Sequence, residues 1–348
     1  MNIHRVTCTV GVKYLLLASC LVSHMLFAAG TTKMGTAAAT FLKIPVGARA
    51  AGMGGSFVSI TDDPGGLYWN PGGLSSIPTT TFVFDHSPWL PGITFDFIGA
   101  VVPVEGLGTV GLSVTMLQTG EMEVTTPAQQ MGTGETFTAS SIALGFSYSR
   151  SLTEQFSIGG TFKFIRETIY NSSASGIAFD VGTIFHTPFA GIRLGASISN
   201  YGTKMQMNGE DLNIRAYIAP NQQGTNQSIV GRLTTDAFDL PLAMRIGISG
   251  EVVNTDDLRL TLSADAVNPN DNAQSVDLGC EVGLLDNVFS VRAGYKDLFL
   301  PDNEFGLTLG IGVNRVRFIG DLAVSASYAY QSYVHLGYAN RFTLEIRL

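Results

Sequence analysis

Residues 305–313 read Phe-Gly-Leu-Thr-Leu-Gly-Ile-Gly-Val, with an apolar side chain at every second position. Glycine and threonine fill the positions between them, so an extended chain would have one apolar face and one face of small residues. The same period of two recurs at 258–266, 322–330 and 342–348. Because a helix needs a period near 3.6 residues, these stretches predict β-strands.

Fourteen segments of this kind are expected along the chain. They lie at 79–86, 93–103, 108–118, 136–149, 156–169, 176–186, 191–200, 239–252, 258–267, 275–284, 288–295, 304–313, 320–330 and 341–348. Longer connections, the longest at 201–238, alternate with shorter ones, as is typical of antiparallel membrane barrels. The pattern predicts an all-β membrane protein in which residues 79–348 form a 14-stranded antiparallel transmembrane β-barrel.

The composition agrees with a barrel. The 348 residues are 45% apolar and only 14% charged, whereas soluble domains carry about 25% charged residues. After the first 30 residues no stretch approaches the roughly 20 apolar residues that a membrane-spanning helix needs. A soluble β-sandwich would also alternate, but its open faces should carry many lysines and glutamates, and here the second face is mostly glycine, alanine, serine and threonine.

The N-terminus has the layout of a secretory signal peptide at residues 1–29. Arg5 and Lys13 precede a mostly apolar run that ends in small residues. Without this segment the net charge falls from −8 to −10, and no basic stripe remains to bind nucleic acid. Of the three cysteines only Cys280 remains, and it is expected on the apolar face of a strand. A barrel with this leader is expected in the bacterial outer membrane with both termini in the periplasm.

Residues 30–78 do not alternate and are expected to form a small N-terminal hatch in the lumen of the barrel. Glycines in this stretch allow close backbone approach, and paired aspartates and an Asn-Pro-Gly-Gly sequence favour turns. The residues that define this hatch motif are Gly47, Arg49, Gly52, Met53, Gly54, Gly55, Asp62, Asp63, Trp69, Asn70 and Pro71.

The hatch motif resembles a known signature. Gly-Ala-Arg-Ala-Ala-Gly-Met-Gly-Gly-Ser-Phe at 47–57, then Asp62-Asp63 and Trp-Asn-Pro-Gly-Gly-Leu at 69–74, is similar to the N-terminal signature of the PorV/PorQ family, outer-membrane barrels related to the FadL long-chain fatty-acid transporters. The family usually has alanine where Gly72 stands. The resemblance implies a hatch inside a FadL-like barrel. For PorV-type members it also implies a role in type IX secretion, in which the barrel binds the C-terminal domain of secreted cargo and passes it to an attachment complex.

Three functions remain open from the sequence. The first is a type IX secretion component whose outer loops contact secreted cargo proteins or secretion-complex subunits, with candidate contacts at Trp89, Tyr217, Asn221 and Asn226. The alternative is a FadL-like transporter of hydrophobic small molecules across the outer membrane. A purely structural, porin-like barrel is the third, and it would require an open pore.

Charged residues on the predicted inner face favour the first function, because a conduit for hydrophobic solutes should have apolar walls. They are expected to form ion pairs around the hatch: Lys163, Glu167, Arg245, Arg259, Asp265, Asp277, Glu281, Arg292, Glu345 and Arg347. Paired Asp62 and Asp63 could bind a cation, but aspartates in a turn more often cap backbone amides. No histidine is spaced to serve a nucleophile, so the sequence predicts no catalytic site, no cofactor and no metal site.

Overall fold

A computed structural model of the chain describes residues 34–189, 191–216, 229–255, 257–301, 303–317 and 320–348. The predicted signal peptide at 1–29 and the first residues of the predicted hatch lie outside this part. Long antiparallel strands form most of the described fold. They are β1 (Thr81–Leu90), β2 (Ile93–Val104), β3 (Gly108–Thr119), β6 (Ala139–Ser151), β7 (Phe156–Ile169), β8 (Ser172–His186), β9 (Arg193–Gly202), β15 (Ala243–Asn254), β16 (Leu258–Pro269), β17 (Ser275–Leu284), β18 (Phe289–Leu298), β19 (Leu307–Arg317), β20 (Ala323–Tyr333) and β21 (Gly337–Arg347).

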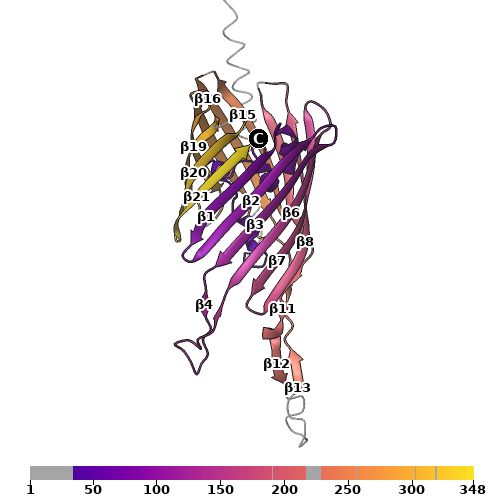
Figure 1. Cartoon of the computed structure of the whole chain (residues 1–348), viewed down its shortest axis with the longest axis vertical. Helices are drawn as coiled ribbons and strands as arrows, with labels where there is room; N and C mark the ends of the chain where they lie inside the picture. The colour runs from indigo at the N-terminus through magenta and orange to yellow at the C-terminus, as the bar shows by residue number, and fades with distance from the viewer. Residues whose placement is uncertain (1–33, 190, 217–228, 256, 302, 318–319) are drawn as a thin grey trace, which may run out of the picture. The chain divides into compact units, whose positions relative to one another are not determined.

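These strands form one closed barrel (Figure 1). Each strand pairs with its neighbour in the chain order just given, the last strand β21 pairs with β1 from Thr81↔Arg347 to His86↔Phe342, and β9 bridges β8 and β15. The first strand therefore begins at the same end of the barrel as the last strand ends. The 14-stranded antiparallel barrel predicted from the sequence is confirmed.

Side chains alternate across the wall as a barrel requires. On the outward face Leu112, Ile246 and Ile311 are 57%, 53% and 58% exposed, whereas inward-facing Thr308 and Asp265 are 0% exposed. Cys280 lies on the outward face beside Leu278 and Val282, as expected. The outer surface is thus apolar and the inner surface is rich in small and polar residues.

The strand boundaries differ from the predicted ones by a few residues. The structure matches the predictions at 156–169 and 275–284, but β1 extends to Leu90, β8 begins at Ser172, and β21 begins at Gly337. At the start of β8 the prediction missed a strand end where small polar residues occupy both faces, Ser172-Ser173-Ala174-Ser175, and at the end of β1 it stopped before Ser87-Pro88. Hydrophobic alternation disappears at such ends, although backbone pairing continues.

Short strands extend the connections at the end of the barrel away from the C-terminus (Figure 1). One hairpin joins β3 to β6, and the connection from β9 to β15 holds several further elements. These are β4 (Met122–Glu123) and β5 (Thr136–Phe137) in the first, and β10 (Met205–Gln206), β11 (Asn208–Gly209), η3 (Glu210–Leu212), β12 (Asn213–Ala216), β13 (Ile229–Arg232) and β14 (Ala237–Phe238) in the second. The predicted loop 201–238 is therefore partly a β-structure.

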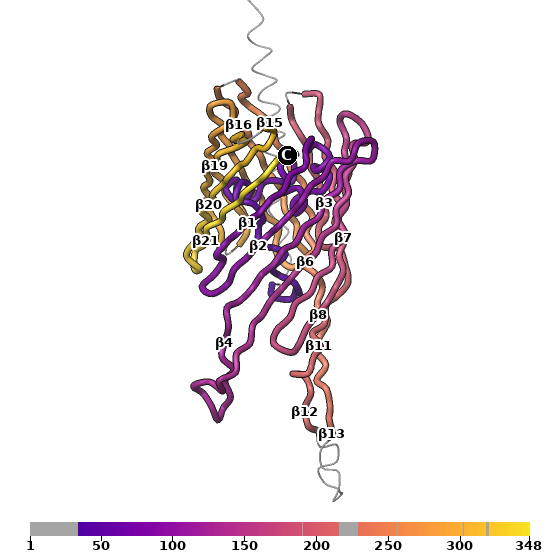
Figure 2. Tube along the Cα trace, viewed as in Figure 1, coloured from indigo at the N-terminus to yellow at the C-terminus, as the bar shows by residue number. Residues whose placement is uncertain are grey.

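The N-terminal segment, residues 34–80, lies within the barrel (Figure 2). It contains four short helices: η1 (Thr40–Lys43), α2 (Ala48–Gly52), α3 (Gly66–Trp69) and η2 (Pro71–Ser76). From Gly52 to Thr61 every residue is buried. Among the described residues, no helix is long and apolar enough to cross a membrane.

Candidate functional site

Contacts between the N-terminal segment and the inner wall define the candidate site. Glycine interrupts the segment too often for long helices, so its shape depends on side-chain caps. Asn70 is fully buried, and its Oδ1 accepts a hydrogen bond from the backbone N–H of Gly72 at 3.0 Å, which caps η2 just before Pro71. Its Nδ2 donates to the carbonyl oxygens of Val58 at 2.7 Å and Thr183 at 3.1 Å. Asn70 therefore joins two parts of the segment to β8.

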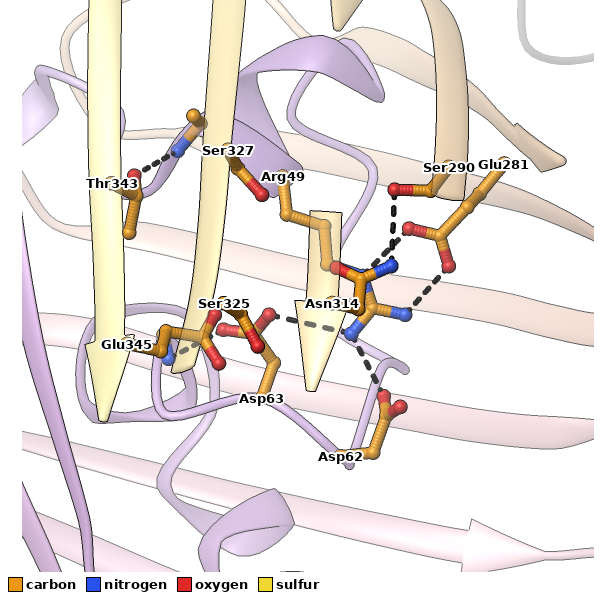
Figure 3. Close-up of polar contacts among 12 residues, drawn as sticks. Arg49, Asp62, Asp63, Glu281, Ser290, Asn314, Ser325, Ser327, Thr343 and Glu345 are labelled. Carbon is orange, nitrogen blue, oxygen red and sulfur yellow. Dashed lines mark hydrogen bonds and ion pairs between the residues drawn. The ribbon is translucent and has the colours of Figure 1, made fainter. Parts of the chain in front are cut away.

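Arg49 forms the centre of an ion-pair network with β17 and with the segment itself (Figure 3). Its Nε and Nη2 donate to both carboxylate oxygens of Glu281 at 2.8 Å, and its Nη1 contacts Asp62 at 3.0 Å and Asp63 at 3.3 Å. Asp63 Oδ1 also accepts from the N–H of Gly65 at 2.7 Å. The aspartate pair weighed as a cation site thus binds a guanidinium and a backbone amide.

Glu281 on β17 receives two further arginines from the wall. Arg292 Nε lies 2.7 Å from its Oε2, and Arg259 Nη2 lies 2.9 Å from its Oε1. Both Glu281 and Arg292 are 1% exposed, so neither charge could remain there without partners. The expected ion pairing is thus present for Arg259, Glu281 and Arg292, and also for Lys163, which pairs with Asp180, and for Arg347 with Glu345. Among the described residues, Glu167, Arg245 and Asp277 form no ion pair and instead contact backbone or hydroxyl groups.

The network also sets the charge states of its members in the segment. Burial opposes the charge on Arg49, but Asp62, Glu281 and Asp63 outweigh that effect and raise its pKa well above the ordinary value. Burial likewise opposes ionisation of Asp62, yet the guanidinium groups of Arg49 and Arg259 hold its pKa well below the usual range. Both groups are charged at any physiological pH, so the ion pair between Arg49 and Asp62 persists over that range.

Backbone amides at the start of α2 bind a second acidic group. Asp85 on β1 accepts from the N–H of Gly47 at 3.2 Å and from Thr343 Oγ1 at 2.6 Å, and it also pairs with Arg341. Thr343 in turn accepts from the N–H of Ala48 at 2.7 Å. The amides that begin α2 are therefore satisfied by the wall.

Asp265 departs from the expected ion pairing. Its Oδ2 accepts from the N–H groups of Phe57 at 2.7 Å and Val58 at 2.8 Å. No salt bridge involves it among the described residues. The prediction of an ion pair is wrong at this position. Backbone N–H groups of the segment bind the carboxylate instead, and no cationic side chain of the described residues pairs with it.

Glycines of the segment lie close to glycines of the barrel wall. A Cβ added at Gly52 would lie 3.0 Å from the Cα of Gly310, and one at Gly54, whose φ is +69°, would lie 2.7 Å from the carbonyl oxygen of Leu278. Fully buried Met53 packs between them against Gly279. The face of small residues predicted from the sequence is thus the surface against which the segment packs.

Hydroxyl groups of the wall satisfy the segment's carbonyl groups. Such donors come from several strands around the barrel: Ser157 to Gly72 at 2.7 Å, Ser263 to Ser56 at 2.9 Å, Thr308 to Gly52 at 3.1 Å and Ser249 to Ser59 at 3.2 Å. Trp69 Nε1 donates within the segment to the carbonyl of Val46 at 2.9 Å, and Arg245 lies 5.4 Å over its ring. A Cβ added at Gly55 would lie 3.2 Å from Oδ2 of Asp277. The carbonyl groups of Gly52, Ser56, Ser59 and Gly72 thus have partners on the wall, whereas the hydroxyl groups of Ser56 and Ser59 have none.

An apolar cluster fills the lumen on the other side of the segment, toward the end with the long hairpins. Phe95, Phe97 and Ile165 of the wall and Met205 of β10 pack with residues of the segment. Leu117, Met207 and Trp89 are partly buried against them. From the segment the cluster includes Phe41, Leu42, Tyr68 and Trp69. The small residues and scattered charges expected on the inner face are therefore not the whole lining, because at this end the lumen has apolar walls.

Trp89 and a small cavity lie at this end of the barrel. Trp89 belongs to β1 rather than a loop, and its ring packs edge-on against Tyr333 with centroids 5.4 Å apart. Beside Leu117 and Met207 a small cavity of about 130 Å³ also borders Glu167. The other candidate partner contacts, Tyr217, Asn221 and Asn226, lie outside the described residues.

A larger cavity of about 810 Å³ opens at the end of the barrel where the C-terminus lies. We call it the basic cavity, because six arginines line it: Arg49, Arg259, Arg292, Arg315, Arg317 and Arg347. Arg49 and Asp62 belong to the N-terminal segment, so the segment closes one side of this cavity. No cluster of three or more His, Cys, Asp or Glu side chains suited to a metal occurs in the described part of the chain.

The geometry defines a class: a closed 14-stranded barrel whose lumen holds an N-terminal segment. No protein-family model matches this chain, and no curated protein does either. Solved structures do match. The CymD monoaromatic hydrocarbon channel is 14% identical, with 87% of this chain and 97% of that chain covered and a TM-score of 0.56. A Pseudomonas aeruginosa FadL homologue is 13% identical over 87% and 98%, with a TM-score of 0.51.

A third match is the Pseudomonas putida toluene transporter TodX, 12% identical over 86% of this chain and 96% of that chain, with a TM-score of 0.53. At these identities the likeness establishes the fold, which is that of FadL-like barrels. The resemblance to the PorV/PorQ family rests on the motif at 47–74 alone.

Several contacts of the site carry no signal in the sequence. Asp85 and Thr343 bind the start of α2 from strands that are 258 residues apart in the chain, and Arg49 meets Glu281 across 232 residues. The apolar lining was hidden because β2 has apolar residues on both faces: Phe95 and Phe97 point inward, whereas Ile98 and Val102 point outward. The sequence of such a strand does not show that its inward face is apolar.

Proposed function

We propose that this protein is an outer-membrane transporter of hydrophobic small molecules, and that its N-terminal segment is a hatch that must shift for a solute to pass. This reverses the ranking expected from the sequence, in which type IX secretion came first. The reason for the change is the apolar cluster, since charge in the lumen was the main argument against a hydrophobic conduit.

The single observation that carries the proposal is the position of the apolar cluster. It lies inside the barrel at the end with the long hairpins, with Leu117, Met207 and Trp89 only partly buried at its edge. A site that binds hydrophobic molecules should combine a concave apolar surface with few polar groups. Here the small cavity next to Leu117 and Met207 is also lined by Glu167 and by four hydroxyl-bearing residues, Thr119, Ser140, Ser141 and Thr168.

The structural neighbours support the same class of solute. CymD is described as a monoaromatic hydrocarbon channel and TodX as a toluene transporter. Outward apolar side chains around the whole barrel suit the hydrocarbon region of a membrane. The first strand begins and the last strand ends at the same end of the barrel. We place that end, and with it both termini, in the periplasm, and we place the long hairpins at the cell surface.

Ligand binding tests this proposal. Purified full-length protein in detergent should bind radiolabelled toluene saturably, and Leu117→Gln should weaken binding about tenfold, because it adds a polar group to the apolar edge. Leu233→Gln, at an exposed position of the same end, is the matched control and should bind like the wild type. Absence of saturable binding by the wild type, or equal binding by both variants, would contradict the proposal.

Cargo binding in type IX secretion is the second candidate. Two observations favour it: the motif at 47–74 and the hairpins β4–β5 and β12–β13 that extend beyond the barrel. A photo-crosslinker at exposed Arg232 in β13 should capture a secreted protein or a secretion-complex subunit in the native host. Crosslinks to neither kind of protein would remove this candidate.

A further inference from the structure

The basic cavity is separate from the apolar cluster, and nothing in the proposed transport function requires it. Its walls come from the ends of β16 to β21 and from the N-terminal segment. Its volume of about 810 Å³ exceeds by far the roughly 30 Å³ share of one water molecule. A charged space of this size at one end of the barrel can admit a polar ligand.

A break in the strand pairing brings two of its arginines inward. Strands β19 and β20 pair without interruption from Thr308↔Gln331 to Val313↔Ala326 and resume at Val316↔Val324. Two residues, Asn314 and Arg315, therefore lie opposite Ser325 alone, which is the pattern of a β-bulge. The Arg315 N–H donates to Ser325 Oγ at 3.0 Å.

Without the bulge Arg315 and Arg317 would follow Leu309, Ile311 and Val313 onto the outward face. With it, both line the cavity. Arg315 has a φ of +51°, a left-handed conformation that L-residues other than Asn and Asp seldom adopt. Bulges and strained residues of this kind are frequent at sites where a side chain is redirected toward a ligand.

The arginines of the cavity retain unused hydrogen-bond donors. Arg259 and Arg347 each have a buried Nε without a hydrogen-bond partner, although other nitrogens of both pair with Glu281 and Glu345. Among the described residues, no ion pair involves Arg315 or Arg317. A buried N–H without an acceptor is costly, so this set of donors is incomplete.

Acidic side chains also line the cavity, and most of them are already paired. Glu281 pairs with three arginines, Asp62 with Arg49, and Glu345 with Arg347. The remaining acids, Asp286 and Asp321, are exposed in the turns after β17 and β19. Among the described residues, Arg315 therefore has no acidic partner, and Arg259 and Arg347, although paired, each keep a buried Nε–H without an acceptor.

We propose that the basic cavity is a binding site for a phosphate group, held by Arg259, Arg315 and Arg347. A phosphate offers several acceptor oxygens and matches the planar fork of a guanidinium better than a single-point anion. Because Arg49 and Asp62 form one wall, a bound phosphate also contacts the N-terminal segment. The source of the phosphate is either a free ion or a lipid headgroup.

Titration of the full-length protein in phosphate-free detergent tests the site. Inorganic phosphate should bind saturably by isothermal titration calorimetry. Arg315→Gln should weaken binding about tenfold or more, through loss of a charged hydrogen bond, and Arg347→Gln should do the same. Arg166→Gln, an outward arginine on β7, should leave binding unchanged. Circular dichroism and heat modifiability verify that each variant is folded.

The two sources are separated by competition with short-chain phosphatidic acid. Displacement of inorganic phosphate at lower concentration identifies a lipid headgroup, and failure to displace it identifies free phosphate. The proposal is overturned if the wild type binds neither probe, or if Arg315→Gln and Arg347→Gln bind as well as the wild type. Phosphate binding is measured independently of toluene binding, so the result for the phosphate site does not depend on whether the proposed transport function is correct.

Discussion

At the residue scale, Arg49 connects the hatch to the wall. Its guanidinium is the one group of the segment that contacts Glu281, Asp62 and Asp63 at once. Glu281 would keep Arg259 and Arg292 if Arg49 were removed. The loss would therefore fall mainly on the segment and leave the barrel intact.

We predict that Arg49→Gln lowers the free energy of local opening of residues 47–63 by about 2–3 kcal/mol, since charged hydrogen bonds of a buried network are lost. Hydrogen exchange of the segment measures it. Arg150→Gln, at an exposed position at the end of β6, should change nothing. Equal protection of the segment in both variants would show that Arg49 does not hold it.

The pH dependence of this network follows from Asp62. Its pKa is lowered in the folded protein, so its contribution to stability is complete above the unfolded value of about 4 and disappears as the pH falls through the lowered pKa. The difference between wild type and Arg49→Gln should stay constant from pH 8 to 5 and shrink only below about pH 4. A difference that already vanishes at pH 6 would contradict the assignment.

Gly54 allows a test of the close approach between segment and wall. Gly54→Ala should destabilise the segment by about 1–3 kcal/mol, because the new Cβ would lie 2.7 Å from the carbonyl of Leu278 and φ is +69°. The control is Gly306→Ala, where nothing lies within 4 Å. Urea unfolding followed by tryptophan fluorescence compares the two, with Trp69 inside the segment as the reporter.

At the element scale, η2 depends on one cap. Asn70→Ala would remove the acceptor for Gly72 and the donors to Val58 and Thr183. We expect about 2 kcal/mol less protection of residues 70–76 in hydrogen exchange, because buried carbonyl groups lose their partners. Ser75→Ala, whose longer bond to Gly72 is 3.4 Å, should have a much smaller effect. Similar losses in the two variants would refute the role of the cap.

The elements were largely predictable from the sequence, and the site only in part. Strands such as 275–284 have apolar residues on one face and small or acidic ones on the other, so period two located them. The same rule failed for the lining at Phe95 and Phe97, where both faces of β2 are apolar. It also could not show that Arg49 meets Glu281, since only the closed barrel brings positions 232 residues apart into contact.

At the scale of the whole molecule, the segment fills the lumen, so an open pore is not expected. Wild-type protein in planar bilayers should show no steady ion conductance, whereas Arg49→Gln should show brief openings because the segment is less firmly held. A stable, large conductance of the wild type would instead support the porin-like barrel.

The central claim is that hydrophobic solutes cross through this barrel. Its most direct test is the initial rate of uptake of radiolabelled toluene by cells that produce the full-length protein, compared with cells that carry an empty vector. We expect saturable, protein-dependent uptake that falls in Leu117→Gln and persists in Leu233→Gln. Uptake equal to the empty vector, with the barrel folded in the membrane, would contradict it.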